Sequence, residues 1–291
     1  MAKEITAERV WEILRPRKPE SHKGNYGRLL CVCGSSRFRG AAALSTEGAL
    51  RAGAGLVTLA SIEPVFWGIQ SRCPECMFLP CTQNEQGGIH AENAPLLLEQ
   101  LENGSTLLMG PGLGNTEDTR ELVQQLVANS AGGVVLDADA LNAASALPDL
   151  PKPGDHPLIL TPHPGEMARL CGLTVPEVEA SRESITASFA RSQGCVVVLK
   201  GHRTLVAGPD GQVWKNTTGN PGLARGGSGD ILAGMTAGLL AQGLDPLQAA
   251  CCAVFLHGAA ADRCAARFSQ LAMLPHDLFF DLGCLLAQQG R

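Results

Sequence analysis

Short, unbroken apolar runs alternate with longer helical patterns along most of this chain. The runs cover residues 29–33, 55–60, 106–109, 133–136, 157–160 and 195–199. Continuous apolar runs of this length are typical of strands buried on both faces of a parallel sheet. Helical patterns occupy residues 41–52, 116–129, 176–193, 227–242 and 245–268. The alternation predicts an α/β fold with a mainly parallel central sheet.

Two further short runs, residues 204–207 and 212–215, are separated by Gly208-Pro209-Asp210-Gly211. Turn residues between two apolar runs predict an antiparallel hairpin. No change of composition marks a linker, so we expect residues 1–291 to form one domain. The polar, glycine-containing segment 80–93 predicts a loop and suggests no role.

Composition and charge exclude several classes of protein. Hydrophobic residues make up 45% of the chain and charged residues 18%, which excludes a disordered protein. The net charge of −5 argues against non-specific nucleic-acid binding. No run of 18 apolar residues predicts a membrane span, and the N-terminus does not resemble a signal peptide. We therefore expect a cytoplasmic protein with no nucleic-acid or membrane partner.

Eleven cysteines are present, and several lie inside apolar runs, as Cys195 and Cys252 do. Such cysteines are typical of small buried side chains in a reducing compartment. Cys73 and Cys76 form a C-x-x-C, but no second pair follows to complete a zinc site. The pattern favours inert thiols over a metal or redox site.

The strongest chemical motif is Arg225-Gly226-Gly227-Ser228-Gly229-Asp230, which opens a helical pattern. Backbone amides that converge at a helix N-terminus form an anion hole suited to phosphate. A carboxylate beside it, Asp230, could accept a hydroxyl proton during phosphoryl transfer. The structural alternative is that Asp230 only stabilises the helix end.

A second glycine cluster, Gly110-Pro111-Gly112-Leu113-Gly114, follows a predicted strand. Its spacing is not G-x-G-x-x-G, and no G-x-x-x-x-G-K-[ST] exists in the chain. The cluster indicates either a ligand-binding loop at the carboxyl end of a strand or a plain turn.

Taken together, the motifs resemble one family. Gly226 to Asp230 is similar to the anion hole and base of the ribokinase-like superfamily. The other segments are Ser21-His22-Lys23-Gly24-Asn25-Tyr26-Gly27, Arg51-Ala52-Gly53-Ala54-Gly55-Leu56-Val57, Gly110 to Gly114, Leu136-Asp137-Ala138-Asp139-Ala140-Leu141-Asn142, Thr161-Pro162-His163-Pro164-Gly165-Glu166 and Lys200-Gly201-His202. In this order they resemble the ADP- or ATP-dependent NAD(P)H-hydrate dehydratases, over residues 5–285.

The resemblance implies a ribokinase-like three-layer αβα sandwich and a cofactor-repair reaction. The S-epimer of hydrated NADH or NADPH would be phosphorylated on its ring hydroxyl, and loss of phosphate would restore NADH or NADPH. ADP or ATP would be the co-substrate, with Mg²⁺. The chain has no room for an epimerase domain, so an NAD(P)H-hydrate epimerase would be a separate partner. We also expect a homo-oligomer.

The resemblance also assigns candidate residues. Catalysis falls to Asp230 as base and to the anion hole of Gly227, Ser228 and Gly229. The hydrate would contact Ala41, Ala42, Gly112, His163 and Asp230. The nucleotide would contact Lys200, Gly201, His202, Arg203, Thr204 and Gly229, and Glu166 would help place magnesium.

Each assignment has a structural alternative. Helix capping would account for Glu166, and equally for Asp137, Asp139 and Asn142, which could otherwise place a metal. His163 could be an ordinary loop residue, and Lys200 an exposed lysine at a strand end. Two other functions remain open. A ribokinase-superfamily kinase acting on a vitamin-precursor alcohol would share Asp230, and a non-catalytic nucleotide sensor would not need it.

Overall fold

A computed structural model describes residues 2–291. Ten strands in this range form one sheet, in the order β1-β10-β9-β8-β7-β6-β5-β2-β3-β4. They are β1 (Lys3–Glu4), β2 (Arg28–Val32), β3 (Leu56–Ile62), β4 (Met77–Cys81), β5 (Thr106–Met109), β6 (Val134–Leu136), β7 (Leu158–Leu160), β8 (Val196–Leu199), β9 (Leu205–Ala207) and β10 (Val213–Lys215). All neighbours pair in parallel except β8 with β9 and β9 with β10.

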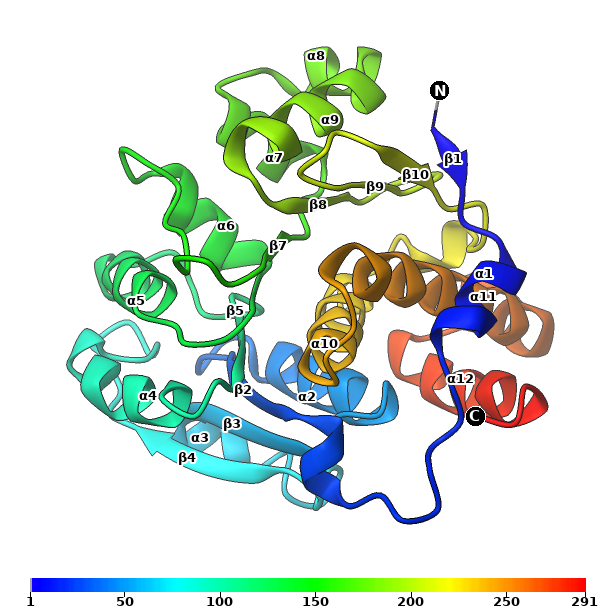
Figure 1. Cartoon of the computed structure of the whole chain (residues 1–291). Coiled ribbons are helices and arrows are strands. Elements are labelled where there is room, and N and C mark those ends of the chain that lie inside the picture. The colour runs from blue at the N-terminus through cyan, green and yellow to red at the C-terminus, as the bar shows by residue number, and fades with distance from the viewer. Residues whose placement is uncertain (1) are drawn as a thin grey trace.

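Helices cover both faces of this sheet (Figure 1). One layer contains α2 (Arg39–Arg51), α10 (Ser228–Ala241), α11 (Pro246–Ala272) and α12 (Leu278–Gln288), with α1 (Ala7–Ile13) against α11. The other contains α4 (Ala94–Leu101), α5 (Glu117–Ala128), α6 (Ala138–Ser145), α7 (Pro164–Cys171), α8 (Val175–Ala180) and α9 (Arg182–Gln193); the short α3 (Glu63–Phe66) packs on β3 and β4. The ribokinase-like three-layer fold is thereby confirmed.

Helix α10 is the central helix of its layer. It contacts α2 and α11 as well as β2, β5 and β6. Its residues from Ile231 to Leu240 are all buried, because neighbours surround it on every side. Dense packing fixes the position of its N-terminus, which carries the glycine motif.

The structure confirms the six predicted strands and the hairpin, with small shifts of their ends. It corrects the helix expected over residues 176–193, which is divided into α8 and α9. Ser181 interrupts it with non-helical backbone angles, φ −138° and ψ 36°. Strands β1 and β4, at the two edges of the sheet, were not predicted. Strand β4 contains Pro80, which an edge strand tolerates because its outer N–H groups need no partner.

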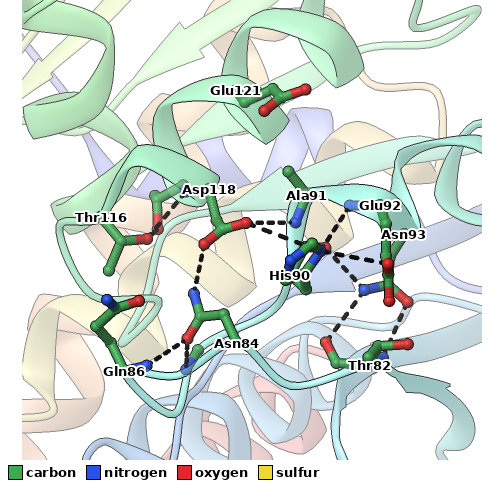
Figure 2. Close-up of polar contacts among 12 residues, drawn as sticks. Thr82, Asn84, Gln86, His90, Ala91, Glu92, Asn93, Thr116, Asp118 and Glu121 are labelled. Atoms are coloured by element: carbon green, nitrogen blue, oxygen red, sulfur yellow. Dashed lines mark hydrogen bonds and ion pairs between the residues drawn. The ribbon is translucent and has the colours of Figure 1, made fainter.

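The polar segment 80–93 is an ordered loop held by buried side chains (Figure 2). Asp118, in the first turn of α5, accepts hydrogen bonds from the Asn84 side chain at 2.9 Å and from the Ala91 amide at 2.7 Å. The Asn93 side chain accepts from the Thr82 amide and donates to the carbonyl oxygens of Thr82 and His90. The Gly87 carbonyl accepts from the Ser36 amide at 2.8 Å, which places the loop beside the carboxyl end of β2.

All eleven cysteines are free, and Cys73 and Cys76 are both buried. Burial raises the pKa of Cys73 to about 11 and that of Cys76 to about 12, so both are protonated at neutral pH. In the part of the chain described, no helix combines the length and the apolar character needed to cross a membrane.

Candidate active site

The parallel strands place the motifs that follow them at one edge of the sheet. Strands β2, β5, β6, β7 and β8 run in the same direction, so the loops that follow them share that edge. These loops carry the segments that begin at Cys33, Gly110, Asp137, Thr161 and Lys200, and the N-terminus of α10 lies near them. The motifs that follow strands therefore share this edge with the glycine motif of α10, whereas residues 21–27 and 51–55 precede β2 and β3 and lie at the opposite edge, near the C-terminus of α10.

The anion hole forms at the start of α10. Gly227 is the N-terminal cap, with φ +101°, and no side chain caps this end. A Cβ at Gly227 would lie 2.7 Å from Leu44 Cδ1 and 3.3 Å from Pro275 Cγ, so only glycine fits this position and this backbone angle. The first amides of a helix have no partner within the helix and carry its positive dipole end. The Gly229 amide is available to an anion, and the Ser228 amide beside it donates only a long hydrogen bond, of 3.3 Å, to the Arg225 carbonyl.

Asp230 follows directly, in the first turn of α10. Burial, supported by the negative charge of Asp137, raises its pKa from 3.8 to about 6, although Lys200 opposes the shift. A carboxylate with a pKa near 6 is mostly ionised at neutral pH and still a better proton acceptor than an exposed aspartate. Asp230 therefore has the protonation state and basicity that a general base requires.

Lys200 is the cation at the centre of the site. Its ammonium donates a hydrogen bond to Asp137 Oδ1 at 2.6 Å and lies 3.6 Å from Glu166 Oε2. Burial alone would lower its pKa, but the charges of Asp137 and Glu166 outweigh burial and raise the pKa of Lys200. Asp137 is 1% exposed and also accepts from Thr161 Oγ1 at 2.7 Å. Lys200 is thus a paired, partly buried cation and not the exposed lysine of the structural alternative.

His163 and Glu166 cap α7 through each other. His163 Nδ1 accepts from the Gly165 amide at 2.9 Å, and Glu166 Oε2 accepts from the His163 amide at 2.7 Å. Burial would raise the pKa of Glu166, but hydrogen bonds from His163 and the charge of Lys200 outweigh it and lower that pKa. The His163 ring remains half exposed, so capping leaves it accessible to a ligand.

The residues expected to contact a nucleotide line one cavity of about 630 Å³, a size typical of small-molecule sites. Lys200, Gly201, His202, Arg203 and Thr204 form one wall, and Ser228 and Gly229 lie at the anion-hole end. Sequence reasoning missed other lining residues, which include Asn216, Thr218, Val254 and His257. No recognised motif contains these residues, although the polar run Asn216-Thr217-Thr218-Gly219-Asn220 lies directly before the glycine cluster.

Three of the residues expected to contact the hydrate, Ala41, Ala42 and Gly112, lie where the loop after β5 meets the start of α2. Gly112 has φ +67°, and a Cβ there would lie 2.8 Å from the Cβ atoms of both Ala41 and Phe38. Phe38 is 51% exposed beside them. Ala42 differs from the expectation: it is 0% exposed, because its methyl group faces Gly34 in the core, and so it offers no surface to a ligand.

The described residues contain no cluster of three or more His, Cys, Asp or Glu side chains arranged to hold a metal ion. Both oxygens of Glu166 already have protein partners, Oε1 with His163 and Oε2 with the His163 amide and Lys200. Asp139, expected at the end of a strand, lies inside α6 and accepts from the Gly114 amide at 2.8 Å. These carboxylates do not form a ready magnesium cage.

The sheet and its helices form a three-layer αβα sandwich, and the N-terminus of α10 has no side-chain cap. A carboxylate and a cavity adjoin this N-terminus, and the fold is that of the ribokinase-like class. Comparison with known proteins narrows this class. The family described as NAD(P)H-hydrate dehydratase matches residues 29–282. The chain therefore belongs to the NAD(P)H-hydrate dehydratase family.

Individual relatives agree. The chain is 45% identical over 90% of its length to the bifunctional NAD(P)H-hydrate repair enzyme of Moorella thermoacetica, of which the match covers 49%. It is 38% identical to the ADP-dependent (S)-NAD(P)H-hydrate dehydratase of Bacillus subtilis, over 94% of both chains. A crystal structure of the ADP/ATP-dependent enzyme from Bacillus subtilis, co-crystallised with ATP and Mg²⁺, superposes with a TM-score of 0.87 at 36% identity, covering 99% of each chain. The chain spans about half the length of the bifunctional relatives.

Proposed function

We propose that this protein dehydrates the S-epimer of hydrated NADH or NADPH to NADH or NADPH, using ADP or ATP. The observation that carries the proposal is the position of Asp230, with its raised pKa, directly beside the α10 anion hole and the 630 Å³ cavity. The names of the relatives support the choice of substrate over other alcohols.

The chain's own groups divide the reaction between them. Asp230 accepts the proton of the ring hydroxyl, whose oxygen forms a bond to the terminal phosphorus of the nucleotide. The bond from that phosphorus to the bridging oxygen breaks, and the bridging oxygen keeps the electrons, so ADP leaves as AMP and ATP leaves as ADP. The amides at Gly227, Ser228 and Gly229 stabilise the negative charge that develops on the transferred group. Phosphate then leaves with the electrons of the C–O bond while the neighbouring carbon loses a proton, which restores the ring double bond. Phosphate is a far better leaving group than hydroxide, which explains a kinase-like site in a dehydratase.

The residues that line the site would position the two ligands. We assign the nucleotide to Lys200, Gly201, His202, Arg203, Thr204 and Gly229. We assign the hydrate to Ala41, Gly112, His163 and Asp230. Ala42 would contribute through its packing in the core beside Ala41. Mg²⁺ would arrive with the nucleotide phosphates, its usual ligands in such sites, with Glu166 nearby.

We also propose that residues 1–291 act as one domain in a cytoplasmic homo-oligomer. An NAD(P)H-hydrate epimerase would be a partner activity, as the bifunctional relatives suggest.

The test is an assay with purified protein. The S-epimer of hydrated NADPH is mixed with ADP or ATP and magnesium, and recovery of the absorbance of reduced nicotinamide is followed. We expect recovery that requires both protein and nucleotide. Phosphorylation of a thiazole or pyrimidine alcohol, with the hydrate left unchanged, would replace the proposal with a small-molecule kinase.

A further inference from the structure

Two buried polar atoms beside the cavity lack hydrogen-bond partners. Within residues 2–291, nothing pairs with His257 Nε2 or with Ser228 Oγ. Both residues are 7% exposed, and both line the cavity. A buried donor or acceptor left unpaired costs about 1–3 kcal/mol, so such atoms in a cavity wall indicate a ligand that completes them.

The two residues come from different helices that meet at the anion hole. Ser228 is the first residue of α10, and His257 lies in α11, which packs along α10. Gly258, the next residue of α11, lies so close to Thr218 that a Cβ would overlap its backbone. The position of His257 is therefore fixed by packing rather than by a flexible loop.

The protonation state of His257 follows from its surroundings. Burial lowers the pKa of His257 to about 4, and the positive charge of Lys200 lowers it further. A contact with the backbone of Ser228 acts in the opposite direction and raises the pKa. The ring is neutral at neutral pH, so one nitrogen carries hydrogen and the other is an acceptor. The contact with the Ser228 backbone raises the pKa of His257, and Nε2 has no hydrogen-bond partner. With hydrogen on Nδ1, Nε2 is free to accept a hydrogen bond.

The neighbours of His257 indicate which part of a nucleotide it meets. The backbone of Ser228 contacts the His257 ring, at the end of the cavity where the Gly229 amide suits phosphate. Val254 lies about one helical turn before His257 on α11, and it lines the cavity together with Leu223 and Leu232, whose apolar side chains suit a base. Between the phosphates and the base of a nucleotide lies the ribose, whose hydroxyl groups are hydrogen-bond donors.

We propose that His257 binds the ribose of the nucleotide, with Nε2 accepting a hydrogen bond from a ribose hydroxyl and Ser228 Oγ as a second partner. The inference rests on the proposed function, because it assumes that the cavity holds ADP or ATP. It makes His257 a determinant of specificity for ribonucleotides over deoxyribonucleotides.

Calorimetric titration without hydrate tests the proposal. Wild-type protein is titrated with ADP, 2′-deoxy-ADP and 3′-deoxy-ADP, and so are His257→Leu, His257→Gln and the control His156→Gln. His156 is an exposed residue before β7 and lies outside the cavity. We expect wild type and the control to bind ADP about 3- to 10-fold more tightly than one of the deoxy analogues, as one hydrogen bond allows. His257→Leu should lose this difference, and His257→Gln, which keeps an acceptor, should recover part of it.

The outcomes are distinguishable. Equal binding of all three nucleotides by wild type, or a difference that persists in His257→Leu, overturns the role of His257 and leaves the proposed function intact. Failure of wild type to bind any adenine nucleotide overturns both. If His257→Leu does not fold, nitrogen NMR of the wild-type imidazole decides: the Nε2 resonance must respond to ADP and not to the discriminating deoxy analogue.

Discussion

The ammonium of Lys200 lies 2.6 Å from Oδ1 of Asp137, a residue 63 positions earlier in the chain. This pair joins the ends of β6 and β8, and Glu166 and Asp230 are its next charged neighbours. The Lys200 ammonium thus interacts with three acidic groups, Asp137, Glu166 and Asp230, in a partly buried site. Its charge lowers the pKa of Glu166 and opposes the rise in the pKa of Asp230.

Removing the charge of Lys200 should destabilise the fold as well as nucleotide binding. In Lys200→Met, Asp137 would become a buried carboxylate without its cation, which typically costs about 3–5 kcal/mol. Urea denaturation measures the loss, and the double variant Lys200→Met/Asp137→Asn should recover most of it. Lys18→Met, at an exposed position, is the control. Binding of nucleotide should weaken more than binding of hydrate, and equal affinities before and after the change would remove Lys200 from the nucleotide site.

The pH dependence of kcat should report the pKa of Asp230. Because the carboxylate must be ionised to accept a proton, activity should rise with pH through about 6. Lys200 lowers the pKa of Asp230, so Lys200→Met should move this acidic limb to higher pH. Asp139 raises the same pKa, so Asp139→Asn should move the limb to lower pH. Shifts in the same direction for both variants would contradict this account.

Gly112→Ala should weaken binding of the hydrate. The new methyl group would lie 2.8 Å from Phe38 and Ala41, at a backbone angle that L-residues rarely adopt. Gly114→Ala is the matched control, since Gly114 also has a positive φ, of +86°, but faces open space. Both variants carry backbone strain, of about 1–3 kcal/mol. Both variants should therefore lose stability, but only Gly112→Ala should also raise the KM for hydrate. An equal KM for hydrate in the two variants would refute a contact between Gly112 and the substrate.

His163 has two roles that substitution can separate. His163→Ala removes the cap of α7, which typically costs about 0.5–2 kcal/mol, and removes the exposed ring. His163→Asn restores a good capping residue without the ring. If the ring contacts the hydrate, both variants should show a raised KM while only His163→Ala shows a lower melting temperature. A normal KM in His163→Asn would leave His163 as a cap alone.

The fold and the edge that carries the site could be predicted because both depend on local patterns. Buried parallel strands appear as continuous apolar runs, and the motifs that follow them must share an edge. The capping role of His163 had a local indication as well, since Glu166 three residues later forms the spacing of a capping box. The pairing of Lys200 with Asp137 had none, because only the register of β6, β7 and β8 brings them together.

The remaining differences have similar causes. Strand β1 has two residues, too few for a hydrophobic pattern, and forms only because β10 offers a free edge. Ala41 and Ala42 have the same side chain, so the sequence cannot show that Ala41 faces Gly112 while Ala42 faces the core. His257 lies in an apolar helix where its side chain resembles a packed residue, and its unpaired Nε2 exists only in the folded protein.

Asp230→Asn provides the most direct test of the mechanism, because catalysis and stability should change in opposite directions. The amide keeps the size of the side chain but cannot accept the hydroxyl proton, so kcat should fall about 10²–10⁴-fold while both ligands still bind. The amides of Ser228 and Gly229 should leave some residual activity, since they act on the phosphoryl group.

Stability should rise in the same variant. The pKa of Asp230 is about 6 in the folded protein against 3.8 ordinarily, so ionisation at neutral pH costs the folded state up to about 3 kcal/mol. Asparagine removes that cost, which is fully present above pH 6 and disappears below pH 4. Asp230→Asn should therefore be more stable than wild type at pH 8, with a gain that shrinks as the pH falls from 6 to 4. Turnover within about threefold of wild type, far from the effect of a lost base, would reduce Asp230 to a helix-end charge. Lost turnover without the pH-dependent gain would mean that the carboxylate is not held in the buried, negatively charged surroundings that make it a base.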